Sequence, residues 1–328
     1  MILYLKSQIG FLYSGTSAVY IFFCLSGFIL TYACINKGDI LYNSSKMFLS
    51  RHLRLAIPTF FSIIICAVIL FIFKGNADNM PWISQFGKNV NLEILPVIYN
   101  SLFSSVILGD ASYNWVVWTM QIELFGSFLI FFSAPIIHNL KARAFFYILF
   151  SLVFCMNYPT KIGFGYAAFM LGAAIYYIPV LKNKFFAAVI LLIGLYLSGY
   201  HHKQTFYSAL SQLEIEILNK NGIQGSFLYL MISGALIVMV CIKSNIITFI
   251  TSNRLSIWLG KLSFSAYLLQ MPVFYIITPT MFAYLSTNGF SYTIAAFLTS
   301  IFCLFFLYFI SIFFPKYIDS KSTFLSKN

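Results

Sequence analysis

A single carboxylate stands in an aromatic-rich apolar segment. Residues 115–132 contain one charged residue, Glu123. A carboxylate at the hydrocarbon level of a bilayer costs about 2.5 kcal/mol or more unless a partner, water or a substrate compensates it. On a helix, the residues that share roughly one face with Glu123 would be Trp115, Trp118, Thr119, Ile122 and Phe125–Gly126. The pattern predicts a reactive pocket; the alternative is a buried ion pair that only holds helices together.

Two arginines form the second group of candidates. Arg51 and Arg54 are three residues apart in Ser50-Arg-His-Leu-Arg-Leu-Ala-Ile-Pro58, so on a helix they share a face. Two guanidinium groups can clamp a phosphate or a carboxylate. Alternatively, they anchor a helix end at lipid headgroups, or one of them is the partner that Glu123 requires. We take Arg51 and Glu123 as candidate catalytic residues.

A polar stripe is the third group. Ser263, Tyr267 and Gln270 recur at helical spacing in the apolar segment 258–272, and Pro272 is expected to kink this helix. Such a stripe either lines a cavity or joins helices through hydrogen bonds. The candidate substrate-binding residues of the whole chain are Arg54, Asn114, Trp118, Ser263 and Tyr267.

Several common catalytic signatures are absent from the sequence. It has no G-x-S-x-G, Gly-rich phosphate loop, H-E-x-x-H or His-x4-Asp box, which argues against serine hydrolases, P-loop ATPases and zinc proteases. The six cysteines lie in apolar stretches, and no two form a close pair. We expect no metal site and no bound cofactor. Since no histidine lies within an apolar segment, the usual base for activating a hydroxyl is not visible, and Glu123 is one candidate for it.

The elements that position these residues must be membrane helices. Of the 328 residues, 60% are hydrophobic and only 9% are charged, whereas soluble domains carry about 25% charged residues. We therefore predict an all-α, polytopic transmembrane bundle that forms one membrane-embedded domain over residues 1–328. The net charge of +12 comes from Lys and Arg scattered between apolar segments, which favours a lipid bilayer rather than nucleic acid as partner.

The hydrophobic pattern predicts about nine spans, since a helical span needs about 20 apolar residues. A further segment, 94–109, is short and dotted with polar groups, so we expect an interfacial or re-entrant piece. Residues 201–224 are expected to form a loop. The predicted spans are 17–35, 55–73, 113–137, 144–157, 163–181, 185–200, 225–242, 262–283 and 291–314.

The positive charges predict an orientation for these spans. With the C-terminus in the cytoplasm, fourteen Lys and Arg fall in inner segments and six in outer ones, as the positive-inside rule requires. The same scheme leaves the N-terminus outside without a signal-peptide layout. We therefore expect one span to be missing before residue 1.

Four segments, in this order, resemble the acyltransferase-3 family of integral membrane acyltransferases, which includes O-acetyltransferases of bacterial surface polysaccharides. Residues 19–31 are similar to its Phe-Phe-x-Leu-Ser-Gly-Phe helix, and residues 48–58 to its Arg-x-x-Arg-(x)n-Pro element. Residues 118–123 are similar to Trp-Ser/Thr-Leu-x-x-Glu, and residues 260–269 to Gly-x-x-Ser-(Tyr/Phe)-x-x-Tyr-Leu. The resemblance spans about residues 10–315.

This resemblance implies a multi-pass protein of the bacterial inner membrane with ten helices. It implies that an acyl group, expected to be acetyl, moves from cytoplasmic acyl-CoA to a hydroxyl of an extracytoplasmic glycan or lipid-linked sugar. Arg51 and Arg54 would hold the donor's phosphates or orient catalytic groups, and Glu123 would lie in the reaction chamber with Trp118 and Tyr267.

Two departures from the family pattern leave alternatives open. The family's first helix, with its Arg and His, has no counterpart here, and its Tyr-Leu-x-His element reads Tyr267-Leu-Leu-Gln270. One alternative is therefore a truncated, catalytically inactive homologue. The other is a glycan flippase or polymerase-type membrane protein, which a donor assay separates because a flippase needs no acyl-CoA.

Overall fold

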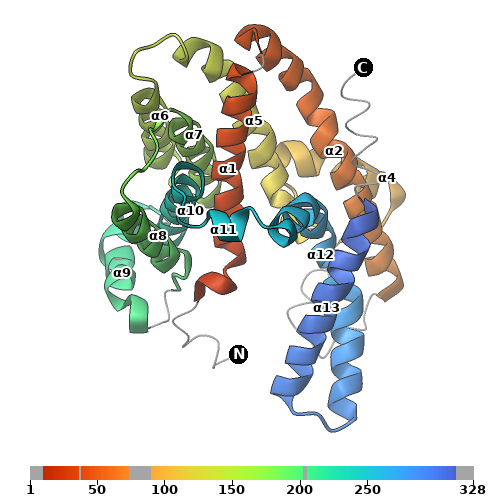
Figure 1. Ribbon diagram of the computed structural model, residues 1–328. Helices are drawn as coiled ribbons and strands as arrows, with labels where there is room; N and C mark the ends of the chain where they lie inside the picture. Colours follow the sequence, from red (N-terminus) through yellow and green to blue (C-terminus); the bar gives the residue numbers. More distant parts are fainter. Residues whose placement is uncertain (1–9, 37, 74–89, 202–204, 315–328) are drawn as a thin grey trace. The chain divides into compact units, whose positions relative to one another are not determined.

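The computed structural model describes residues 10–36, 38–73, 90–201 and 205–314 (Figure 1). Within these ranges every regular element is helical and no strand occurs, which confirms the all-α prediction. The helices of eight or more residues are α1 (Gly15–Ile35), α2 (Ile40–Phe73), the π-helix Asn100–Leu108, α5 (Trp118–Ile137), α6 (Arg143–Asn157), α7 (Lys161–Tyr177), α8 (Lys184–Ser198), α10 (Gly225–Lys243), α12 (Arg254–Thr287) and α13 (Tyr292–Phe314).

Six of these helices are long and apolar enough to cross a membrane, namely α1, α2, α5, α10, α12 and α13. The shorter apolar helices are α6, α8 and the continuous helix formed by α4 (Ile94–Tyr99) with the π-helix. α7 has 17 residues. The chain is therefore a multi-pass membrane protein. The inner-membrane location and the cytoplasmic C-terminus stay predictions.

Two helices begin earlier than their hydrophobicity suggests. α2 begins at Ile40 rather than near residue 55, and α12 begins at Arg254 rather than near residue 262. Charged residues lower the hydropathy of these first turns, yet Lys and Arg are good helix formers. The start of α2 is also capped, because Asp39 Oδ1 accepts from the N–H of Leu41 at 2.8 Å.

The stretch expected to be a loop, 201–224, is partly helical. It contains Thr205–Tyr207, α9 (Ser208–Leu213), the π-helical turn Glu214–Leu218 and Asn219–Asn221. The loop prediction is therefore wrong for most of the described part. Alternating polar and apolar residues hid these short helical turns, which are too short for a clear period.

The chain divides into two compact units, each built from two separate stretches of sequence. Unit 1 comprises Met1–Phe48 and Phe125–Asn253, and unit 2 comprises Leu49–Leu124 and Arg254–Asn328. α2 and α5 each contribute residues to both units. That the chain forms one domain stays a prediction.

In unit 1, small residues let α1 approach α7 and α10 closely. A Cβ atom on Gly172 of α7 would lie 1.9 Å from the carbonyl oxygen of Cys24 in α1. A Cβ on Gly27 of α1 would lie 2.1 Å from the carbonyl oxygen of Phe169. A Cβ on Gly234 of α10 would lie 2.8 Å from the backbone carbonyl carbon of Tyr20 in α1. Such close backbone contact is how membrane helices associate without a hydrophobic driving force.

We expect Gly172→Ala to prevent stable folding. The new methyl group would collide with backbone atoms of α1, which cannot rotate away as a side chain can, so the cost should exceed about 3 kcal/mol. Yield and thermal unfolding in detergent measure this effect. Gly260→Ala is the matched control, because in the described part of the chain no atom beyond its chain neighbours and its own helix backbone lies within 4 Å of its Cβ position. Equal yields for the two variants would refute this packing.

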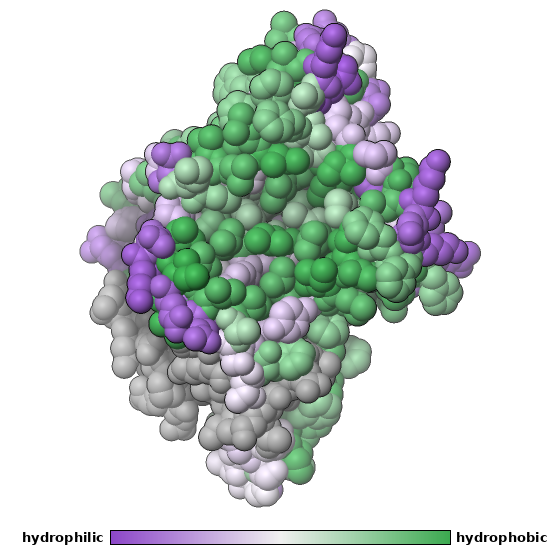
Figure 2. Space-filling view, turned by 90° about the vertical axis from the view of Figure 1, so that its left-hand side faces the viewer, coloured by the Kyte–Doolittle hydropathy of each residue, from purple (hydrophilic) through white to green (hydrophobic). Residues whose placement is uncertain are grey.

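Unit 1 carries many exposed apolar side chains. On the face shown in Figure 2, apolar side chains are contiguous over wide areas, and hydrophilic ones gather in separate groups. α6 and α8 contribute exposed apolar side chains such as Phe145, Met156 and Phe185, which are 60%, 80% and 78% exposed. A surface of this kind requires lipid rather than water around it.

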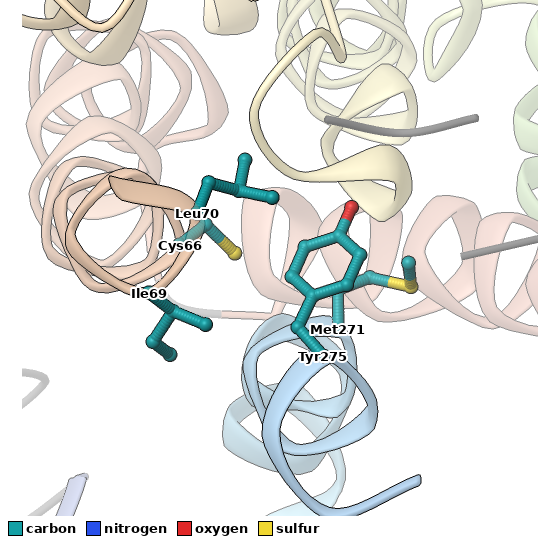
Figure 3. Close-up of a cluster of buried hydrophobic side chains, with 5 residues drawn as sticks. All are labelled: Cys66, Ile69, Leu70, Met271 and Tyr275. Carbon is teal, nitrogen blue, oxygen red and sulfur yellow. The ribbon is translucent and has the colours of Figure 1, made fainter. Parts of the chain in front are cut away.

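Unit 2 has a small core where α2 meets α12 (Figure 3). Cys66, Ile69 and Leu70 of α2 point towards Met271 and Tyr275 of α12 in this cluster. Five partly buried hydrophobic residues pack against it, including Val116, which lies two residues before the first residue of α5. The cluster therefore fixes α2 and α12 beside the beginning of α5, where the sequence placed the candidate catalytic residues.

Candidate active site

Glu123 is buried and ion-paired within unit 2. Only 1% of its side chain is exposed, and Arg51 Nη2 donates to its Oε2 at 2.7 Å. Arg51 lies on α2, and its side chain is 13% exposed. Both charges are largely shielded from solvent. Removing one of them leaves the other buried without this counter-charge, which costs about 3–5 kcal/mol of stability. Of the alternatives for the two arginines, the one in which Arg51 or Arg54 is the partner of Glu123 is confirmed for Arg51.

The two arginines of α2 differ in their surroundings. Arg51 is partly buried and reaches Glu123, whereas Arg54 is exposed. Pro58, one turn after Arg54, lies inside α2 and has no N–H to donate to the Arg54 carbonyl. A joint role of the two guanidinium groups in holding an anion stays a prediction.

Two hydroxyl groups join α5 to α12 one turn before Glu123. Thr119 Oγ1 lies 3.0 Å from the hydroxyl oxygen of Tyr267. Both hydroxyls are also within hydrogen-bond distance of the Val116 carbonyl oxygen, at 3.0 Å for Thr119 and 2.7 Å for Tyr267. Thr119 and Glu123 are four residues apart on one helix, so they share a face. Tyr267 is thereby held beside the face of α5 that carries the carboxylate.

A buried amide and a buried hydroxyl converge on one carbonyl of α12. Asn114 Nδ2 and Ser62 Oγ donate to the carbonyl oxygen of Leu268, both at 3.0 Å, and Asn114 Nδ2 also donates to Ser62 Oγ at 2.5 Å. This carbonyl is available because the residue four positions later is Pro272, which has no N–H. The proline thus creates an acceptor through which α2, α12 and the turn before α5 are joined.

Asn114 also starts the turn that leads into α5. Its Oδ1 accepts from the N–H of Val116 at 3.3 Å, at the beginning of the short 3-10 helix Trp115–Val117. The amide therefore uses its donor and its acceptor at once, and it is completely buried. Sequence reasoning placed Asn114 among the candidates but missed Ser62, because a single serine in an apolar helix carries no signal by itself.

We expect Ser62→Ala to destabilise the protein by about 1–3 kcal/mol, because Asn114 and the Leu268 carbonyl would lose a buried hydrogen bond. Thermal unfolding in detergent would measure the loss. Ser263→Ala serves as control: Ser263 is exposed, and among the described residues its hydroxyl donates to the Gly260 carbonyl of its own helix, at 2.8 Å. A similar effect of both variants would contradict the cross-helix role of Ser62.

The other sequence candidates are less tightly placed. Trp118 is partly buried at the first position of α5. Trp115 and Phe125 are 46% and 37% exposed, so the predicted aromatic face around Glu123 is not wholly enclosed. Ser263 lies outside the hydrogen-bonded group. Substrate contacts of Trp118 and Ser263 stay predictions.

Polar residues of the helix Ile94–Leu108, noted in the sequence, bind the side chain of Asp110, and this contact was not predicted. Asn100 Nδ2 and Ser104 Oγ donate to Asp110 Oδ2 at 2.7 and 3.3 Å, and the Ser112 N–H donates to Asp110 Oδ1 at 3.1 Å. Asp110 follows Gly109, whose φ of 71° ends the helix. Burial and the charge of Asp110 raise the pKa of the nearby Tyr113 phenol. These contacts fix the loop that leads to Asn114.

A second buried carboxylate, Glu214 in unit 1, is held by hydrogen bonds from neighbouring residues. Its Oε1 accepts from the Ser226 N–H at 2.9 Å, at the N-terminus of α10, and its Oε2 accepts from the Tyr200 hydroxyl. Burial and this hydrogen bond raise the pKa of the Tyr200 phenol. Since a carboxylate at a helix N-terminus is stabilised by the free N–H groups there, Glu214 needs no substrate to explain it.

Comparison with known proteins supports the family resemblance. The profile of the acyltransferase-3 family, described as an acyltransferase domain, matches residues 2–314. A curated relative, named O-acetyltransferase PaAT-1 from Phomopsis amygdali, is 26% identical over 167 residues. This match covers 42% of the chain and 33% of the relative, so the chain spans about a third of that protein's length. No solved structure matches significantly.

The family match covers the whole described part of the chain. It includes α2 with Arg51, α5 with Glu123 and α12 with Tyr267. The ordered motifs, the buried ion pair and the apolar helices all lie inside the matched region. The chain therefore belongs to the acyltransferase-3 family of membrane acyltransferases.

Proposed function

We propose that this protein is an O-acyltransferase that moves an acetyl group from acetyl-CoA to a hydroxyl of a glycan or lipid-linked sugar. The family assignment supports acyl transfer, and the relative's name, O-acetyltransferase, supports oxygen as the accepting atom and acetyl as the group. The donor and the sugar acceptor rest on the resemblance of the motifs. The observation that carries the proposal is the buried Arg51–Glu123 pair within the matched region.

The chemistry needs no covalent enzyme intermediate. The acceptor oxygen attacks the thioester carbonyl carbon, so that a C–O bond forms and the C–S bond breaks. The Glu123 carboxylate takes the proton of the acceptor hydroxyl and returns it to the departing sulfur. Arg51 fixes the carboxylate by its 2.7 Å hydrogen bond, and positioning a base in this way is a large part of its effect.

The surrounding residues have supporting roles in this proposal. Tyr267 and Asn114 hold α12 against the beginning of α5 through their hydrogen bonds to Val116 and Leu268. Arg54 contacts the phosphates of the donor, and Trp118 and Ser263 contact substrate. The protein lies in the bacterial inner membrane with a cytoplasmic C-terminus, as the excess of positive charges on the inner segments requires.

Radiolabelled acetyl-CoA tests the proposal directly. Membranes that contain the 328-residue chain should transfer label to glycan or lipid-linked sugar faster than membranes from the same host without the chain. Equal labelling with and without the chain would refute the transferase function and favour an inactive homologue. A translocated but unlabelled glycan would favour a flippase.

A further inference from the structure

A buried hydroxyl on α2 has no hydrogen-bond partner among the residues that the structure describes. Thr59 is completely buried, and its Oγ1 is left unsatisfied. Leaving a buried donor unpaired costs about 1–3 kcal/mol. Seven other buried side-chain atoms among the described residues are also left unsatisfied, and each such group calls for an explanation such as a bound molecule or a catalytic role.

The position of Thr59 on α2 points to the candidate active site. Arg51 and Thr59 are eight residues apart, and Ser62 follows Thr59 by three. These spacings place all three on one face of the helix. Arg51 contacts Glu123 of α5, and Ser62 contacts Asn114 just before α5. Along this face of α2, Thr59 therefore lies between Arg51, which contacts Glu123, and Ser62, which contacts Asn114.

The neighbouring polar groups already have partners. The hydroxyls of Thr119 and Tyr267 are within hydrogen-bond distance of the Val116 carbonyl oxygen, and Ser62 donates to Leu268. Asn114 donates to Ser62 and Leu268 and accepts from Val116. Within this group Thr59 is thus the hydroxyl whose hydrogen is uncommitted. The Thr59 hydroxyl could therefore donate a hydrogen bond to a substrate atom that acts only as an acceptor.

We propose that Thr59 donates a hydrogen bond to the carbonyl oxygen of the acyl group being transferred. This inference rests on the proposed acyltransferase function. When the acceptor oxygen attacks the carbonyl carbon, this oxygen takes up negative charge; when the C–S bond breaks, the charge moves to the sulfur, which receives the proton taken from the acceptor. A hydroxyl fixed beforehand stabilises that charge without reorganisation.

The simplest competing explanation is a harmless packing defect, and the chain contains a matched control. Thr299 of α13 is also in unit 2, is 3% exposed and has an unsatisfied Oγ1. It is not on α2, α5 or α12. In both residues, valine keeps the shape and removes the unsatisfied hydroxyl, so both valine variants should melt at a higher temperature than the wild type.

Transfer rates then separate the two explanations. We expect kcat of Thr59→Val with labelled acetyl-CoA to fall about 100-fold with KM little changed, as when one oxyanion donor is removed. Thr59→Ser, which keeps the hydroxyl, should stay within about 10-fold of the wild type. Thr299→Val should transfer at the wild-type rate.

Three results would overturn the inference while leaving the proposed function intact. One is wild-type turnover by Thr59→Val, and another is an equal loss in Thr59→Ser, which would indicate a shape effect. The third is a lower melting temperature of Thr59→Val, which would show that the hydroxyl already has a partner in the free protein. A wild-type chain that transfers no label would instead refute the proposed function, and the inference with it.

Discussion

Glutamine at position 123 is expected to lower acetyl transfer by about 100- to 10,000-fold, the range that one acid–base group contributes. The amide keeps the shape of Glu123, and its oxygen can still accept from Arg51, but it cannot take a proton from the acceptor hydroxyl. The fold should therefore persist at lower stability, because the Arg51 guanidinium keeps a hydrogen bond but loses its counter-charge, while turnover is lost. Initial rates with labelled acetyl-CoA, together with melting temperatures, measure both effects.

Glu216→Gln is the matched control for this variant. Glu216 is exposed on the turn Glu214–Leu218, where its Oε1 accepts from Gln212 Nε2 at 2.9 Å. The substitution should leave transfer unchanged. If Glu123→Gln also transferred at the wild-type rate, Glu123 would not be the base, and a purely structural ion pair would explain its burial.

The second large effect is on stability. Arg51→Met should destabilise the protein by about 3–5 kcal/mol, because it leaves the Glu123 carboxylate buried without its positive partner. Methionine matches much of the volume of arginine, so the loss reports the charge rather than a cavity. Thermal or denaturant unfolding in detergent measures it. Arg54→Met, a change at an exposed position of the same helix, should leave stability nearly unchanged, and comparable losses in the two variants would contradict the pairing.

Sequence reasoning predicted the helical elements well where a hydrophobic run ended at clear polar residues. The predicted span 225–242 corresponds to α10, Gly225–Lys243, and 291–314 corresponds to α13, Tyr292–Phe314. It failed at α2 and α12, whose first turns carry Lys and Arg. Hydropathy reports which residues lipid tolerates, whereas backbone hydrogen bonds decide where a helix begins.

The candidate site could be predicted in part because an isolated charge in an apolar segment demands a partner. That demand identified Glu123 and offered Arg51 as one solution, and the structure places these two 2.7 Å apart. Ser62 and Thr59 gave no such signal. A serine or threonine hydroxyl can donate to a backbone carbonyl of its own helix, so its presence in an apolar segment does not demand a partner elsewhere. One clue was available for Ser62: Pro272 leaves the Leu268 carbonyl without its helical donor.

The most direct test of the account is the double variant Arg51→Met with Glu123→Leu. Replacing a buried ion pair by apolar residues of similar size is often neutral or stabilising, so this variant should melt at or above the temperature of Arg51→Met alone. If the pair performs the chemistry, the folded double variant transfers no label from acetyl-CoA. A folded double variant that transfers label at the wild-type rate would contradict the central claim that this ion pair is the catalytic centre.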